Sequence, residues 1–137
     1  MSVAACRGTA EPSVIEVRDA WARPCLAGTP CGVYATLINR SDAAVEVVSV
    51  RSPRAATVEL HESMVHDGQA HMMAHPTVSI PARGTLDGRP GKWHLMLLGV
   101  SSALVVGDSI PLTFAVRVAG GRDSTTMVSA TAIVRAP

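Results

Sequence analysis

Histidine and methionine crowd into one short segment of the chain, where together they offer a soft set of metal ligands. All five histidines and four of the six methionines lie between His61 and Met96. Imidazole nitrogen and thioether sulfur suit Cu(I), whereas Ca²⁺ and Mg²⁺ prefer hard oxygen ligands. The segment therefore predicts a copper-binding site rather than a calcium or magnesium site.

The alternation of apolar residues predicts how these side chains are held. Successive side chains of a β-strand point to opposite faces of a sheet. In the run TVELHE, Val58 and Leu60 therefore face one way and His61 the other. In the run KWHLMLL, His94 and Met96 share one face, and most of the apolar residues between and around them take the opposite face. Such a strand would hold an imidazole and a thioether side by side on an element whose other face packs into the core.

The whole chain has the pattern of an all-β protein. Val and Thr are abundant, and amphipathic stripes of helical length are absent. Short alternating runs recur roughly every 8–12 residues, with Asp67-Gly68 as a strong hairpin signal and 119–123 as a second hairpin connection. We expect about eight or nine strands in an antiparallel β-sandwich over residues 14–137, preceded by an N-terminal tail at 1–13.

Charge and hydropathy exclude several classes of function. The 12 basic and 11 acidic residues nearly cancel and are scattered, so nucleic acid is not an expected partner. No stretch approaches the roughly 20 apolar residues of a membrane-spanning helix. Neither a G-x-S-x-G elbow nor an HExxH zinc helix is present, so an enzyme is not predicted. A metal-free adhesion or scaffold domain would leave the His/Met segment unexplained.

The Cys25/Cys31 pair and the single Cys6 each have two possible interpretations. Cys25 and Cys31 lie in a Pro/Gly-rich segment that can turn back on itself, which favours a small loop disulfide in an oxidising compartment. A thiolate pair for a metal is the alternative, although the spacing is wider than the C-x₂₋₄-C usual for zinc. Cys6 ends the run VAAC, which resembles the end of a bacterial lipobox and would carry a lipid anchor. An incidental cysteine in a frayed tail is the other reading.

Four of the soft donors have the spacing H-x₁₀-M-x₂₁-H-x-M, namely His61, Met72, His94 and Met96. With this spacing, and with the flanking runs DAWAR, VELHE, PGKWHLMLLG and GDSIPLTF, the chain resembles the PCuAC family of bacterial periplasmic copper chaperones. The resemblance covers roughly Val14 to the C-terminus. It implies a cupredoxin-like, immunoglobulin-like Greek-key domain that binds Cu(I) through these four residues without catalysing a reaction.

The resemblance also implies a cellular role. Proteins of this family look like periplasmic carriers that deliver copper to subunit II of cytochrome c oxidase, often alongside a Sco-type thiol protein. The ligand chemistry agrees, because thioethers add no charge to Cu(I) and imidazoles donate more strongly. A site without thiolates can also hold copper outside the reducing cytosol, where paired cysteines oxidise to a disulfide. A blue-copper electron carrier is not expected, because no cysteine follows Cys31. We expect a monomer.

The chain departs from the family pattern in the donors around the motif. Family members often carry Met two residues after the first His, whereas this chain has Ser63 there and Met64 one residue later. Met73 lies on the opposite face from Met72 if the segment is extended, which predicts a core or edge residue. Met127, in the last predicted strand, is expected to pack in the core.

Three histidines are not required by the motif. His66, His71 and His75 are predicted to be solvated residues of the hairpin and the following loop. The alternative is that some of them join His61 in a second, harder site for Cu(II) or Zn(II), with Met64 and Met73 as further accessory donors. In that case the protein would sequester copper or zinc in the periplasm as well as carry Cu(I).

Overall fold

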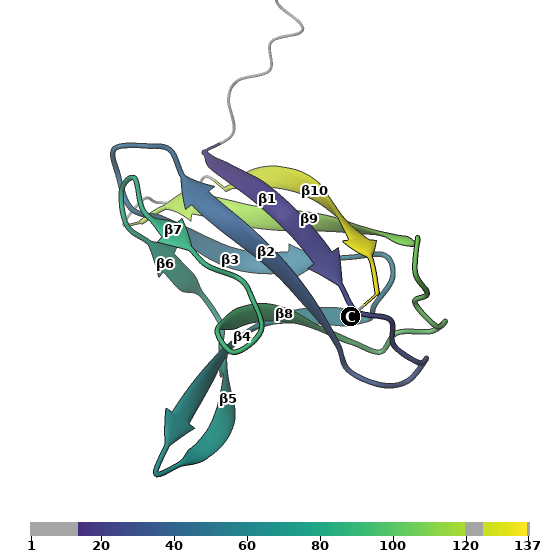
Figure 1. Cartoon of the computed structure of the whole chain (residues 1–137). Coiled ribbons are helices and arrows are strands. Elements are labelled where there is room, and N and C mark those ends of the chain that lie inside the picture. Colours follow the sequence, from purple (N-terminus) through teal and green to yellow (C-terminus); the bar gives the residue numbers. More distant parts are fainter. Residues whose placement is uncertain (1–13, 120–124, 137) are drawn as a thin grey trace, which may run out of the picture.

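The computed structural model describes residues 14–119 and 125–136, and this part of the chain contains ten β-strands and no helix (Figure 1). Cys6, with the lipobox-like run, and most of the 119–123 connection lie outside the described residues. The strands, in chain order, are β1 (Ile15–Ala22), β2 (Cys31–Asn39), β3 (Val45–Arg51), β4 (Thr57–His66), β5 (Gln69–His75), β6 (Val78–Ile80), β7 (Thr85–Leu86), β8 (Trp93–Leu98), β9 (Ser109–Val118) and β10 (Thr126–Val134).

The strands form one sheet that closes on itself. Its order is β5-β4-β8-β2-β1-β10-β9-β3-β6, and β7 pairs with β2. Because Val50 of β3 also pairs with Val58 of β4, the seven strands from β4 to β3 close into a barrel. The all-β class is confirmed, whereas the β-sandwich is wrong in detail. The expected antiparallel arrangement also fails at one place, since β1 and β10 run parallel.

The barrel interior is filled by aliphatic side chains around a single phenylalanine, Phe114. β2 shows how the sequence achieves this: its residues alternate strictly between buried and half-buried positions along the strand. Met127 does not belong to this interior; it lies exposed on β10, so its expected core position is wrong. A disulfide joins Cys25 to Cys31, with their Cα atoms 6.0 Å apart, and ties the preceding loop to the first residue of β2.

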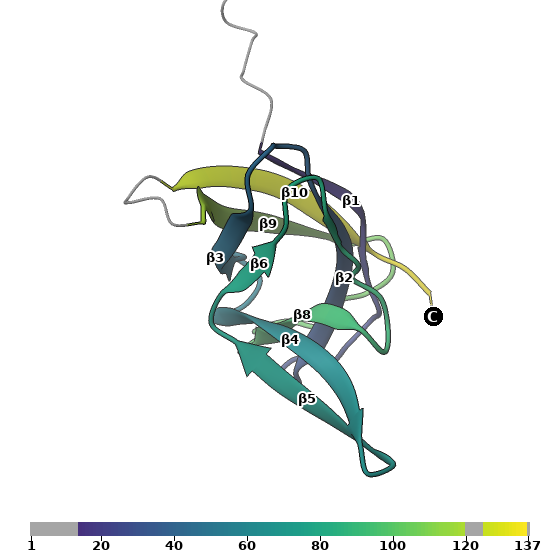
Figure 2. The same ribbon diagram turned by 90° about the vertical axis from the view of Figure 1, so that its left-hand side faces the viewer.

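β4 and β5 form a hairpin that extends away from the barrel (Figures 1 and 2). The first half of β4 pairs with β8 inside the barrel wall, whereas its second half pairs with β5 alone. At the tip, Asp67 and Gly68 have φ angles of 53° and 79°, the left-handed conformation that Asp-Gly favours in two-residue turns. The predicted Asp67-Gly68 hairpin is confirmed. Most of the His/Met segment therefore lies on one projecting hairpin and on the adjacent strand β8.

Candidate metal centre

The four residues of the spaced motif lie on one face of the sheet formed by β5, β4 and β8. His61 of β4 is directly opposite His94 of β8, and their ring centroids are 5.4 Å apart in an edge-on arrangement. Met96 lies two residues further along β8. Met72 of β5 is opposite Ser63, which lies two residues beyond His61 on β4. Because opposite residues and residues two apart share a face, both imidazoles and both thioethers project from the same side.

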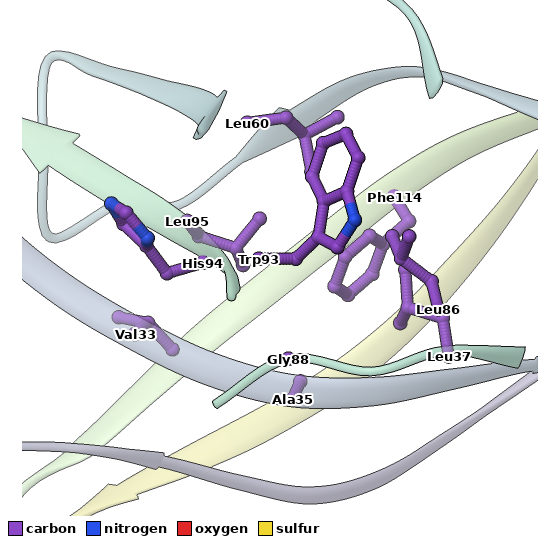
Figure 3. A pocket seen from close by; sticks show the side chains of 10 residues that line it. All are labelled: Val33, Ala35, Leu37, Leu60, Leu86, Gly88, Trp93, His94, Leu95 and Phe114. Carbon is purple, nitrogen blue, oxygen red and sulfur yellow. The ribbon is translucent and has the colours of Figure 1, made fainter. Parts of the chain in front are cut away.

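The exposure of the four side chains changes across this face. His94 is 5% exposed, whereas Met72, on the projecting hairpin, is 61% exposed. The exposure of His61 and of Met96 lies between these two values, since both side chains are half-buried. On β8, Trp93 and Leu95 pack toward Phe114, whereas the imidazole of His94 points away from them (Figure 3). The donor set thus has a buried end at His94 and an accessible end at Met72.

Two nitrogens at the centre of this face have no hydrogen-bond partner. Within the described residues, Nδ1 of His61 and Nε2 of His94 are both buried and unpaired. A buried polar atom without a partner costs about 1–3 kcal/mol, so such atoms are rare unless they serve a ligand. Two such atoms on neighbouring rings, flanked by two thioethers, fit a bound soft metal ion.

The other nitrogen of His61 is occupied. Its Nε2 lies 2.8 Å from Oε1 of Glu59, which stands on the same face of β4 and opposite Met96. A carboxylate that holds one ring nitrogen fixes the orientation of the imidazole and leaves the second nitrogen for a metal ion. Glu59 is therefore a positioning residue of the candidate site.

The electrostatics keep His94 in the form that binds metal. Burial lowers the pKa of His94 from its ordinary value of 6.5, and the nearby His61 lowers that pKa further. A hydrogen bond to the backbone of Lys92 opposes the shift in part. The ring is therefore neutral at neutral pH, as metal coordination requires.

The depressed pKa of His94 predicts that the metal-free protein loses stability in acid. The unfolded chain takes up a proton near pH 6.5, whereas the folded chain does so only at lower pH. Between these two pH values the unfolded state binds more protons than the folded state. The free energy of unfolding is therefore unaffected by His94 above pH 6.5 and decreases as pH falls from 6.5 through the pKa of folded His94. Urea unfolding of wild type and His94→Gln from about pH 8 to about pH 5 checks this, and the variant should show the shallower dependence. Parallel curves would contradict it.

Two residues that the sequence did not single out, Tyr34 and Gly32, line the site. The ring of Tyr34 on β2 lies 6.1 Å from that of His94 and 4.9 Å from Trp21 on β1. Gly32, opposite Met96, has no side chain, and the Tyr34 hydroxyl lies 3.2 Å from where a Cβ would stand. Tyr34 therefore leans over Gly32 toward β8 and forms a wall of the site. On β2, the half-buried Tyr34 alternates with the buried Val33 and Ala35, but nothing in the sequence shows that β2 neighbours β8.

Residues 15–128 match the sequence model of the family described as "Putative lipoprotein LpqE-like". The chain belongs to the LpqE-like family. It is 30% identical over 100 residues to "Putative lipoprotein Lxx21020" of Leifsonia xyli subsp. xyli, which covers 72% of this chain and 60% of that protein. It is 28% identical over 100 residues to "Uncharacterized protein RP573" of Rickettsia prowazekii, which covers 69% and 55%.

Solved structures place this LpqE-like chain among PCuAC domains. It resembles the copper-bound PCuAC domain from PmoF2 with a TM-score of 0.71 and 21% identity, over 91% of this chain and 95% of that one. It resembles the Cu(I) form of DR1885 from Deinococcus radiodurans with a TM-score of 0.63 and 26% identity, over 97% and 85%. The resemblance to the PCuAC family is confirmed.

The LpqE-like chain spans less than two thirds of the length of the curated relatives it matches, at 60% and 55%. In the part of the chain that the structure describes, no helix has the length and apolar character needed to cross a bilayer.

The accessory donors of this LpqE-like chain lie on the opposite face of the hairpin from His61. Met64 is opposite His71, and Met73 is opposite Glu62, so none of these side chains shares a face with Met72. The remaining two are His66, opposite Gln69, and His75, opposite Leu60. The structure therefore does not bring His61 together with these histidines, because the sheet lies between them. Within residues 14–119 and 125–136, no three or more His, Cys, Asp or Glu side chains form a cluster that could hold a metal ion.

Two of these histidines have other partners. Nε2 of His75 lies 3.1 Å from Oε1 of Glu62, and its ring centroid lies 4.9 Å from that of Trp93, with the two rings tilted by 49°. His75 is thus half-buried rather than solvated. His66 stands exposed at the tip, with its Nε2 3.4 Å from Asp67, as expected for a solvated residue.

Proposed function

We propose that this LpqE-like protein is an exported, non-enzymatic copper carrier that binds Cu(I) through His61, Met72, His94 and Met96. The observation that carries this proposal is the pair of buried, unpartnered imidazole nitrogens between two thioethers on one face of the sheet. The copper-bound PCuAC domain of PmoF2 and the Cu(I) form of DR1885 have the same fold, which supports copper as the cargo.

The gradient of exposure supports a carrier rather than a storage site. Met72 is the accessible donor, and thioethers are neutral ligands that an incoming thiolate or imidazole can replace. Transfer would begin as the bond from copper to Met72 sulfur breaks and a bond to the acceptor forms, with copper remaining Cu(I) throughout. An electron-transfer role is not favoured, because the two described cysteines form a disulfide and blue-copper sites need a thiolate.

The acceptor and the location follow from the same chemistry. A periplasmic protein with soft or imidazole ligands fits, such as a Sco-type thiol protein or subunit II of cytochrome c oxidase. The lipoprotein relatives support export and a lipid anchor, for which Cys6 is the candidate residue. We further propose that the carrier acts as a monomer.

A Cu(I) competition titration against a chromogenic chelator tests the proposal. We expect Met72→Leu and Met96→Leu to raise the Kd for Cu(I) at least about tenfold, since loss of even an outer-shell partner weakens metal sites roughly 10- to 100-fold. Met127→Leu is the matched control, because Met127 is exposed on β10 and should leave the Kd unchanged. Unchanged affinity in both site variants would remove the copper site from this face.

A further inference from the structure

The opposite face of the hairpin carries a second group of soft donors. Met64 of β4 is directly opposite His71 of β5, and Met73 lies two residues beyond His71 on the same strand. These three side chains therefore share one face, one cross-strand step and one along-strand step apart. The main site has the same layout, with the pair His61 and His94 and a methionine two residues further along.

The spacing allows the three donors to meet at one ion. Directly opposite residues have Cβ atoms about 4.5–5.5 Å apart, and diagonal neighbours are about 7–8 Å apart. Methionine has three rotatable bonds beyond its backbone, so its sulfur can move several ångströms toward a neighbouring imidazole. Met64 and Met73 can therefore approach the ring of His71 without a change in the backbone.

No structural role competes for these side chains. Met64 is 40% exposed and Met73 is 49% exposed, because the hairpin projects from the barrel (Figure 2). Across the described residues, His71 forms no hydrogen bond or ion pair, whereas His66 and His75 contact Asp67 and Glu62. Two exposed thioethers beside an imidazole without a partner make a surface that core packing does not require.

We propose that Met64, His71 and Met73 form a second, weaker Cu(I) site on the face of the hairpin opposite Met72. Two thioethers and one imidazole select a soft monovalent ion, Cu(I) or Ag(I), over Zn(II) and Cu(II). The site is weaker than the main one because all three donors are exposed and none is held on a barrel strand that packs into the core. Met72 and Met73 are adjacent in sequence but serve opposite faces, so the hairpin would carry one ion on each side.

The test uses the methyl groups of methionine as reporters. The protein is labelled with ¹³C at the methionine methyls and titrated with Ag(I), a redox-inert soft ion, and then with Cu(I) without oxygen. With the first equivalent, the methyls of Met72 and Met96 should shift. With the second equivalent, those of Met64 and Met73 should shift, while Met127 stays unmoved. Unmoved Met64 and Met73 methyls at two equivalents would overturn the second site.

Variants separate the two sites. A triple variant with Met64→Leu, His71→Gln and Met73→Leu should bind one Cu(I) instead of two and keep the tight affinity. His75→Gln is the matched control on the same face and should still bind two, because its ring is engaged by Glu62 and Trp93. The two failures are distinguishable: a triple variant that still binds two ions refutes the second site alone. Unmoved Met72 and Met96 methyls refute the proposed function alone.

Discussion

Replacing His94 with leucine is expected to make the copper-free protein more stable while removing most of its affinity for Cu(I). Nε2 of His94 is buried without a partner, which costs about 1–3 kcal/mol. Leucine has a similar volume and no polar atom to desolvate, so the free energy of unfolding should rise by about 1–2 kcal/mol. Under the proposed function the same change removes the most buried ligand. We expect the Kd for Cu(I) to rise more than roughly 100-fold, beyond the loss of an outer-shell partner.

Urea unfolding and the chelator competition together check both halves of this prediction. His75→Leu is the matched control, because the ring of His75 is half-buried but is paired with Glu62 and packs against Trp93. That control should lose stability and keep its Cu(I) affinity at the main site. If His94→Leu were instead less stable than wild type by more than about 1 kcal/mol, the imidazole would have a structural role. The unpartnered nitrogen would then no longer count as evidence for a ligand.

The sequence pattern predicts which face of β8 carries His94, but it does not predict how deeply His94 is buried. The two-residue period of β8 placed His94 and Met96 on one face, and the structure agrees. The burial of His94 did not follow from that period, because it depends on the neighbouring strand. Tyr34 and Gly32 reach the site only through the pairing of β2 with β8, a long-range contact that local alternation does not encode.

The same limit explains the error in architecture. Alternating strands look alike in an open sandwich and in a closed barrel, since each has one buried face. The closure depends on a single pairing of Val50 with Val58, and the parallel contact of β1 with β10 joins the first strand to the last. Met127 was misplaced because a strand in a barrel still directs half of its side chains outward, and a methionine can stand on either face. The hairpin, by contrast, is local, and Asp67-Gly68 predicted it correctly.

Gly88→Ala is expected to have the largest effect on stability of any single-methyl addition at the glycines whose surroundings the structure describes. A Cβ at Gly88 would stand 2.0 Å from the backbone oxygen of Ala35 and 2.8 Å from its backbone nitrogen. Figure 3 shows Gly88 directly beside Ala35 on β2, with Trp93 and His94 nearby. Overpacking usually costs about 1–3 kcal/mol, and here the obstacle is backbone that no rotamer change can move. We expect a loss of about 3 kcal/mol or more in the free energy of unfolding.

The change should also reach the metal centre, because Gly88 forms a β-bridge with Trp93, the residue before His94. To accept a methyl group, the segment leading into β8 must move away from β2, and His94 moves with it. Gly91→Ala is the matched control: Gly91 lies in the same segment, has a φ of 86° and has open space around it, so it should cost only about 1 kcal/mol from backbone strain. Urea unfolding should show the larger loss of stability for Gly88→Ala, and the Cu(I) titration should show a weaker affinity for that variant alone. Equal losses in both would mean that the segment adapts freely and that its contact with β2 does not position β8.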